Sequence, residues 1–259
     1  MRRRLNRSNW RGLTLTALVC SCAVLLLGAL VSGHISIDPT LAVDVRLADL
    51  LVSWRSEPLT QLFSVITLLG KSYVIVLFCS ALAILLMLWR KGVDLIALVI
   101  VIVGSTTTSS MLKLAFQRPR PEQAIYLESS YSFPSGHATI AVAFYGFVGY
   151  LVMRSASRWW HKMSLLCTTL ALIAAIGLSR LYLGEHYLSD VLAGYLIGAL
   201  WLIIAVASGP GLSRFNAFSA PPILAPVPDR KGLTGLAITL ALAGYLAIVL
   251  TYQMPLTGP

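Results

Sequence analysis

Two histidines that precede or begin apolar runs are the residues of this chain best suited to chemistry. His137 follows a Pro-Ser-Gly turn at 134–136, and a long apolar run continues from it. At a helix N-terminus, unpaired backbone N–H groups and the positive end of the helix dipole favour an anion. Taken alone, this motif is more typical of an ordinary helix start with Ser135 as its N-cap. Its meaning therefore depends on what the rest of the chain can bring to it.

The second histidine, His186, has a carboxylate at helical spacing. Asp190 follows it by four residues at the start of another apolar run, so the two side chains are expected on one helical face. A carboxylate that accepts from one imidazole nitrogen fixes the tautomer and leaves the other nitrogen as a nucleophile or base. A pair that only caps a helix would have the same spacing. Ionisable residues at membrane ends usually serve a function, which favours the catalytic interpretation.

Three cations accompany the histidines: Lys113, Arg120 and Arg180. Together with His137, His186, Asp190 and Ser135 they predict a cationic pocket with one orienting carboxylate. Such a pocket suits phosphoryl transfer, in which cations stabilise the equatorial oxygens, one histidine attacks in line and the other protonates the leaving oxygen.

Several nearby residues receive no catalytic role from the sequence. No second carboxylate and no His/Cys cluster at metal-ligand spacing is recognised, so no metal site is predicted. Arg118 is interpreted as a cation that extends from the membrane interface into water, and Ser179 and Glu185 remain unassigned. His34 and His161 are interpreted as interfacial residues.

Composition places these residues in a membrane protein. Of the 259 residues, 57% are hydrophobic and only 12% are charged, which is too apolar for a soluble domain of this length. The net charge of +10 comes from basic residues scattered at the ends of apolar runs, so nucleic acid is not an expected partner. The four cysteines lie inside apolar runs and are interpreted as buried hydrophobic residues.

The apolar runs predict an all-α, polytopic membrane helix bundle with a six-span core and a seventh C-terminal span. The predicted spans are Leu13–Val31, Ser72–Trp89, Val93–Ser110, Ala138–Met153, Met163–Leu178, Leu188–Ala207 and Gly232–Tyr252.

The polar run at 105–110 should face protein or water. Between the first two spans, Leu41, Val45, Ala48, Leu51 and Val52 would share one face of a helix, with Asp44, Arg46 and Asp49 off it. Such a helix would lie on the membrane or cover a site, although a plain loop fits the sequence as well. The short apolar run Leu59–Leu69 is either a second interfacial helix or the lead-in to the next span.

These runs divide the chain into five segments. A basic N-terminus and retained first span occupy 1–31, an outer-face loop 32–70, and a catalytic core 71–208. A Pro-rich linker at 209–231 and a last span at 232–259 follow.

The distribution of positive charge predicts the topology. With a cytoplasmic N-terminus, the inner segments hold 13 Lys and Arg residues and the outer segments hold seven. This orientation places the loop 111–134, the turn 134–137 and the turn 179–187 together on the outer face of the membrane.

Three stretches of the sequence resemble the type 2 phosphatidic acid phosphatase (PAP2) superfamily. Its motifs are K-x6-R-P, P-S-G-H and S-R-x5-H-x3-D, and all specified positions match in the same order. The matching stretches are Lys113-x6-Arg120-Pro121, Pro134-Ser135-Gly136-His137 and Ser179-Arg180-x5-His186-x3-Asp190. The resemblance covers roughly residues 60–208, and the seventh run lies beyond it.

The resemblance implies a role for each motif residue. His186 would be the nucleophile that forms a phosphohistidine, Asp190 would orient it, and His137 would protonate the leaving group and then activate water. Lys113, Arg120 and Arg180 would bind the phosphate, and Ser135 with the Gly136 amide would complete the oxyanion contacts.

It also implies a substrate class. Family members hydrolyse undecaprenyl diphosphate, phosphatidylglycerophosphate, phosphatidic acid and lipid A phosphates. We expect a multi-pass enzyme of a bacterial inner membrane, active on its outer side, with undecaprenyl diphosphate favoured. No cofactor and no obligate protein partner are expected.

Three alternatives remain open on the sequence. The same set of residues also resembles the site of vanadium haloperoxidases, but those enzymes are soluble, unlike the membrane protein expected here. A phosphotransferase would pass the phosphoryl group to another lipid, and a lipid transporter or scaffold would use the pocket only to hold a headgroup.

Overall fold

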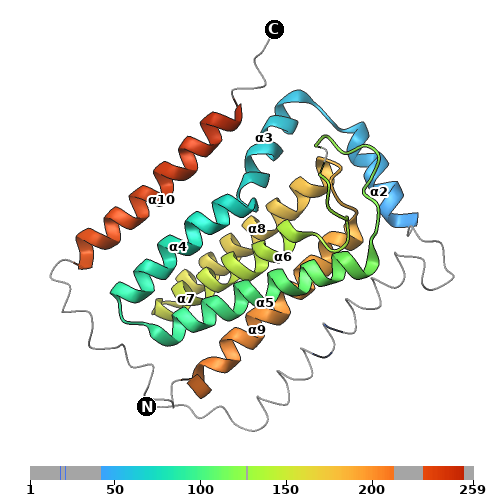
Figure 1. The fold of residues 1–259 in the computed structure, drawn as a ribbon. Helices are drawn as coiled ribbons and strands as arrows, with labels where there is room; N and C mark the ends of the chain where they lie inside the picture. The colour runs from blue at the N-terminus through green and yellow to red at the C-terminus, as the bar shows by residue number, and fades with distance from the viewer. Residues whose placement is uncertain (1–17, 19–20, 22–41, 127, 213–229, 254–259) are drawn as a thin grey trace.

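The computed structural model describes residues 18, 21, 42–126, 128–212 and 230–253, and within these the chain folds as helices and connecting loops (Figure 1). The helices with described bounds are α2 (Ala42–Ser53), α3 (Glu57–Leu68), α4 (Ser72–Leu88), α5 (Gly92–Phe116), α6 (Gly136–Ile140), the π-helical turn η1 (Ala141–Tyr145), α7 (Gly146–Ser155), α8 (Trp159–Tyr182), α9 (Leu188–Leu212) and α10 (Arg230–Gln253).

Among the described residues, four helical stretches are long and apolar enough to cross a membrane: α5, the continuous run Gly136–Ser155, α8 and Leu188–Gly209 of α9. The pair α3 and α4, bent by 43° at a short break, could form a fifth span. The prediction of an all-α, multi-pass membrane bundle is confirmed. The predicted first span, Leu13–Val31, lies outside the described residues except at positions 18 and 21. α10 is apolar over Ile238–Thr251 and packs against α4, apart from the central helices (Figure 1).

Two helices, α5 and α8, extend farther at their C-terminal ends than the sequence predicted. α5 continues to Phe116, so Lys113 lies in its last turn and not in a loop. α8 continues to Tyr182, so Ser179 and Arg180 are helical as well. At the end of α8, Ser179 and Arg180 are buried against protein, which lets the helix continue past the apolar run. Neither α5 nor α8 contains a proline. α5 ends where Gln117 adopts a left-handed conformation, φ 45°, shortly before Pro119.

Two glycines let α9 approach the start of the Gly136–Ser155 helix. A Cβ atom on Gly194 would lie 2.6 Å from the carbonyl oxygen of Ser135, and one on Gly198 would lie 2.5 Å from that of Thr139. The backbone N–H of Ser135 also donates to the carbonyl oxygen of Asp190 at 3.0 Å. Small residues allow this close backbone approach. The two helix starts that carry the motif residues are thereby fixed against each other.

The apolar core lies below this junction, between α4, α5, α7 and α9. Val101, Phe144, Phe147 and Ala205 are buried at its centre. Trp201 of α9 packs against Gly104 of α5 and donates from its indole N–H to Thr108 at 2.9 Å. This packing holds the framework that positions the polar end of the bundle.

α2 lies against the ends of α8 and α9 and covers the polar end of the bundle (Figure 1). The structure has a helix here and not the plain loop that the sequence also allowed. The prediction that Asp44 lies off the buried, apolar face of this helix is wrong. Asp44 is only 2% exposed and points inward, because Arg118 and Ser189 offer it hydrogen bonds.

Candidate active site

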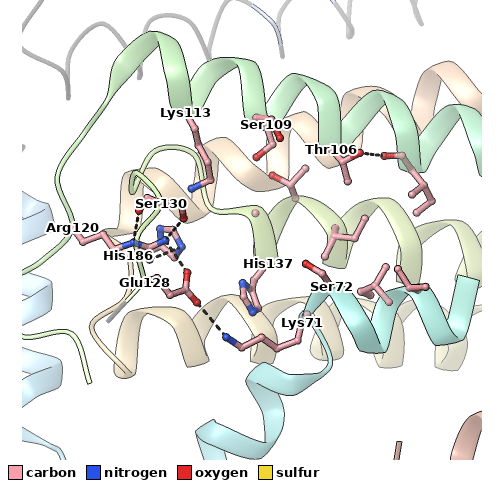
Figure 2. A pocket seen from close by; sticks show the side chains of 18 residues that line it. Lys71, Ser72, Thr106, Ser109, Lys113, Arg120, Glu128, Ser130, His137 and His186 are labelled. Carbon is pink, nitrogen blue, oxygen red and sulfur yellow. Dashed lines mark hydrogen bonds and ion pairs between the residues drawn. The ribbon is translucent and has the colours of Figure 1, made fainter. Parts of the chain in front are cut away.

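A cavity of about 440 Å³ opens at the polar end of the bundle between α4, α5 and the start of α6 (Figure 2). Lys113, Arg120, His137 and His186 line one part of it. Lys71 and Glu128 also line it, together with Ser and Thr residues of several elements. The apolar side chains of the lining come from α4, α5 and α6, namely Ile75, Val76, Ile102 and Ile140. The expectation that the polar run 105–110 faces protein or water is confirmed, since Ser105 and Ser109 are buried and Thr106 lines the cavity. The cavity combines a cationic end with an apolar wall.

His186 lies in the short loop between α8 and α9. Its Nδ1 is 3.5 Å from Oδ2 of Asp190, and its Nε2 is 3.4 Å from the Arg120 guanidinium beside the cavity. Burial lowers the pKa of His186 to about 3, and the charges of Arg180 and Arg120 add to this, outweighing the opposite effect of Asp190. The imidazole is therefore neutral near pH 7. With Nδ1 directed at the carboxylate, Nε2 is the nitrogen that can attack a group in the cavity.

Asp190 is completely buried and held by several donors. Nη1 of Arg118 donates to its Oδ1 at 2.5 Å, while the Ser132 hydroxyl at 2.5 Å and the Tyr187 backbone N–H at 2.9 Å donate to its Oδ2. These hydrogen bonds keep the carboxylate ionised and fix its orientation toward His186.

His137 lies in the first turn of α6 and also borders the cavity (Figure 2). Its Nε2 is buried and has no hydrogen-bond partner among the described residues. The ring packs on the backbone between α3 and α4, where a Cβ atom on Gly70 would lie only 2.6 Å from the ring carbon Cδ2. A buried polar nitrogen without a partner is costly, so this atom is suited to bind a group that enters the cavity.

The three predicted cations converge on the same region. Arg120 donates to Ser130 and to the carbonyl oxygen of Glu185, and Arg180, fully buried, donates to Thr67 at 2.9 Å. Lys113 reaches over from α5 and donates to the carbonyl oxygen of Tyr131.

Of the two remaining predicted site residues, Ser135 and Gly136, one lines the cavity and the other does not. Gly136 lines the cavity. The Ser135 side chain is buried and accepts from the Ala138 backbone N–H at 3.5 Å, as an N-cap does.

The expectation of a single carboxylate is wrong. Glu128 forms ion pairs with Lys71, Arg120 and Arg180 at 3.3, 2.8 and 3.2 Å. Burial would raise the pKa of Glu128, but the three cations outweigh it and lower this pKa to about 2. The sequence offered no signal for this contact, because Glu128 lies in an irregular loop outside every motif.

Glu185 is a further buried carboxylate at this site. It accepts from the Tyr126 backbone N–H at 2.8 Å and lies within ion-pair distance of Arg120 and Arg180. Burial raises its pKa, partly opposed by Arg180. Glu185 thus supports the two arginines from behind, a role that the sequence left unassigned.

The interpretation of Arg118 as an interfacial cation is wrong. It is 2% exposed and donates to Asp44 at 2.9 Å as well as to Asp190 and Ser189, with its guanidinium 4.1 Å from the Tyr187 ring centre. Arg118 therefore links α2 to the carboxylate that orients His186.

Comparison with known proteins agrees with this geometry. The PAP2 superfamily model matches residues 94–213, a range that contains every motif residue. This match confirms the resemblance to the PAP2 superfamily that the three motifs carry. It is 28% identical over 177 residues to phosphatidylglycerophosphatase B of Bacillus subtilis, covering 68% of this chain and 87% of that protein. It is 35% identical over 95 residues to the bacitracin transport permease protein BcrC of Bacillus licheniformis, covering 37% and 42% of the two chains.

Two PAP2-type crystal structures share the fold. A transmembrane PAP2 type phosphatidylglycerolphosphate phosphatase from Bacillus subtilis matches with a TM-score of 0.66 and 26% identity, covering 75% of this chain and 98% of that one. LpxE of Aquifex aeolicus matches with a TM-score of 0.53 and 26% identity, covering 66% and 99%. The likeness extends over nearly the whole of both solved chains.

Proposed function

We propose that this protein is a lipid phosphate phosphatase that works through a phosphohistidine at His186. The observation that carries the proposal is the cavity itself. His186 and His137 both border it, the motif cations Lys113 and Arg120 line the same end, and an apolar wall continues between the helices. The third motif cation, Arg180, contacts Glu128 of the lining. A phosphorylated headgroup would enter the cationic end while its lipid tail stays against α4, α5 and α6.

The reaction would proceed in two steps. In the first, Nε2 of His186 attacks the terminal phosphorus, the bond to the lipid-side oxygen breaks, and protonated His137 gives that oxygen its proton. In the second, His137 takes a proton from water, the resulting hydroxide oxygen bonds to phosphorus, and the P–N bond breaks to release inorganic phosphate.

The cationic residues would stabilise the charge that builds up on the phosphoryl oxygens. We assign the equatorial oxygens to Lys113, Arg120 and Arg180, and a further hydrogen bond to the Gly136 backbone N–H. Ser135 would act indirectly, by capping the helix that carries His137. Asp190 would fix the tautomer of His186 and offset the positive charge of the phosphohistidine.

We propose that this chemistry needs no metal ion or other cofactor. The three motif cations would match the charge of the phosphate, and the attacking nitrogen is already neutral at pH 7. No group of three His, Cys, Asp or Glu residues within the described ranges has an arrangement suited to a metal ion.

Among lipid phosphates we favour undecaprenyl diphosphate, with phosphatidylglycerophosphate and phosphatidic acid as the other candidates. The name of the Bacillus subtilis relative supports phosphatidylglycerophosphate. No protein partner beyond the lipid substrate and the bilayer is proposed.

We also propose an inner-membrane location with a cytoplasmic N-terminus and the cavity on the outer side. A reporter fused after residue 259 should then lie outside if α10 crosses the bilayer as a seventh span. A cytoplasmic reporter would contradict that topology.

The test is phosphate release by the detergent-purified protein in EDTA, with undecaprenyl diphosphate, phosphatidylglycerophosphate and phosphatidic acid as substrates. Release by the wild type and none by His186→Ala is expected. Release that depends on added metal would contradict the metal-free mechanism. Release only when a second lipid accepts the phosphoryl group would identify a phosphotransferase.

A further inference from the structure

Lys71 is a cation of the cavity that belongs to none of the three motifs. It lies at the break between α3 and α4 and lines the cavity, directly after Gly70, on which the His137 ring packs. Its side chain is 25% exposed, and its Nζ extends past His137 toward Glu128 (Figure 2). Lys71 thus reaches the cavity from the side of the proposed acid, apart from Lys113 and Arg120.

The cavity already holds one anionic group between these cations, the carboxylate of Glu128. Lys71 Nζ and Arg180 Nη2 meet at the same oxygen, Oε1, at 3.3 and 3.2 Å, while Arg120 Nη2 donates to Oε2 at 2.8 Å. Donors that share one oxygen are close enough to contact two phosphates joined by a single bridging oxygen. His137 Nε2, buried and without a partner in the described part of the chain, adjoins this space.

The order of groups along the cavity matches that of a lipid diphosphate. Figure 2 shows His186 and Arg120 at one end, with His137 and Lys71 next to them. Ile75 and Val76, which also line the cavity, lie about one turn after Lys71 along α4. A lipid diphosphate has a terminal phosphate, a second phosphate attached to the lipid, and then an apolar tail.

We propose that Lys71 binds the second phosphate of a diphosphate headgroup, the one that stays on the lipid after hydrolysis. This inference rests on the proposed phosphatase function and sharpens its substrate class. When the bond between the terminal phosphorus and the bridging oxygen breaks, that oxygen leaves with the lipid monophosphate. His137 supplies its proton, and Lys71 stabilises the negative charge of the departing phosphate. A lipid monophosphate has no group at this position and gains nothing from Lys71.

The experiment compares farnesyl diphosphate with farnesyl monophosphate, which share one tail, in detergent and EDTA. We expect Lys71→Gln to lower kcat/KM for the diphosphate about ten- to a hundredfold, the range for a lost hydrogen bond between charged groups. The monophosphate should change by less than about threefold, and Lys71→Arg should restore most of the diphosphate activity.

Two variants separate this role from its alternatives. Arg46→Gln removes the same charge from the exposed side of α2, outside the cavity, and should leave the ratio of the two activities unchanged. Glu128→Gln removes the partner of Lys71. If it reproduced the substrate-selective loss of Lys71→Gln, Lys71 would serve only to hold Glu128, and the proposal would be wrong.

The remaining outcomes are distinct. Equal losses for both substrates, or no loss for either, would overturn the role of Lys71 while leaving the phosphatase in place. If the wild type released no more phosphate than His186→Ala from either lipid, the proposed function itself would fail. Should Lys71→Gln lose activity through misfolding, binding of farnesyl diphosphate to His186→Ala, with and without Lys71→Met, gives a second measurement. Equal binding to those two proteins would overturn the proposal.

Discussion

His186 and His137 border the same cavity, but they differ in the hydrogen-bond partners of their ring nitrogens. Nδ1 of His186 faces a carboxylate that itself accepts from Arg118, Ser132 and a backbone N–H. Nε2 of His137 has no partner in the described structure. A nucleophile has to be fixed in one tautomer and direction, whereas an acid that shuttles a proton has to meet first the substrate and then water. The two environments are therefore consistent with the proposed roles of His186 as nucleophile and His137 as acid.

The largest effect should come from removing the fixed histidine. His186→Ala is expected to lower kcat by at least about a thousandfold, because no other described side chain in the cavity presents a neutral nitrogen backed by a carboxylate. Lipid binding should persist, since the cations remain. Single-turnover phosphate release and equilibrium lipid binding would measure this. His161→Ala, at an exposed position, is the control. Appreciable residual turnover in His186→Ala would remove the nucleophile assignment.

Removing the unpartnered histidine should have a smaller effect that depends on the substrate. His137→Ala is expected to lower kcat about 10²- to 10⁴-fold for a lipid ester, the usual contribution of a positioned acid or base. For a nitrophenyl phosphate, whose leaving group departs as a stable anion and needs no proton, formation of the phosphohistidine should be nearly normal. A burst of nitrophenol release in rapid-quench experiments, followed by slow turnover, would show this. Equal slowing of the burst for both substrates would assign His137 to positioning instead.

The motif residues could be predicted to meet because each lies at the outer end of a predicted span, and the charge distribution placed those ends on one face. Lys113, Arg120, His137, His186 and Asp190 do lie together in the structure. The sequence did not reveal how these residues are supported.

Three supporting residues were missed for a physical reason. A buried charge is tolerated only where a partner from another element meets it, and such pairings are long-range in sequence. Asp44 and Arg118, for example, form an ion pair at 2.9 Å although they are 74 residues apart in the sequence. Glu128 likewise meets cations from three separate segments. From each helix or loop taken alone, Asp44 was expected off the apolar face and Arg118 at the membrane interface, and Glu128 had no expected role.

A comparison of the buried ion pairs of Arg118 with the partly exposed pair Arg154–Asp94 tests how much such long-range partners contribute to stability. Arg118→Ala should lower the free energy of unfolding by about 3–5 kcal/mol, because it leaves Asp44 and Asp190 buried without their shared cation. It should also lower kcat, since Asp190 loses its orientation toward His186. The matched control is Arg154→Ala. It breaks the pair with Asp94 at a position where the Arg154 side chain is 44% exposed, so it should cost no more than about 1 kcal/mol. Thermal and denaturant unfolding in detergent would compare the two, and equal losses would contradict the buried network.

The smallest predicted effect concerns the stability of the substrate-free protein in acid. The pKa of His186 is about 3 in the folded protein, below its usual 6.5, so between these values the unfolded chain binds the proton more readily. Its contribution to stability is therefore complete above pH 6.5 and is lost as the pH falls toward 3. The loss should approach about 1 kcal/mol per pH unit in the middle of that range. Glu128, whose pKa is about 2, adds a loss of the same sign only below about pH 4.5. Between pH 6.5 and 4.5 the wild type should therefore lose more stability than His186→Ala does. Parallel curves for the two proteins would mean that His186 is not held neutral by its surroundings, and the contrast between the two histidines would lose its electrostatic basis.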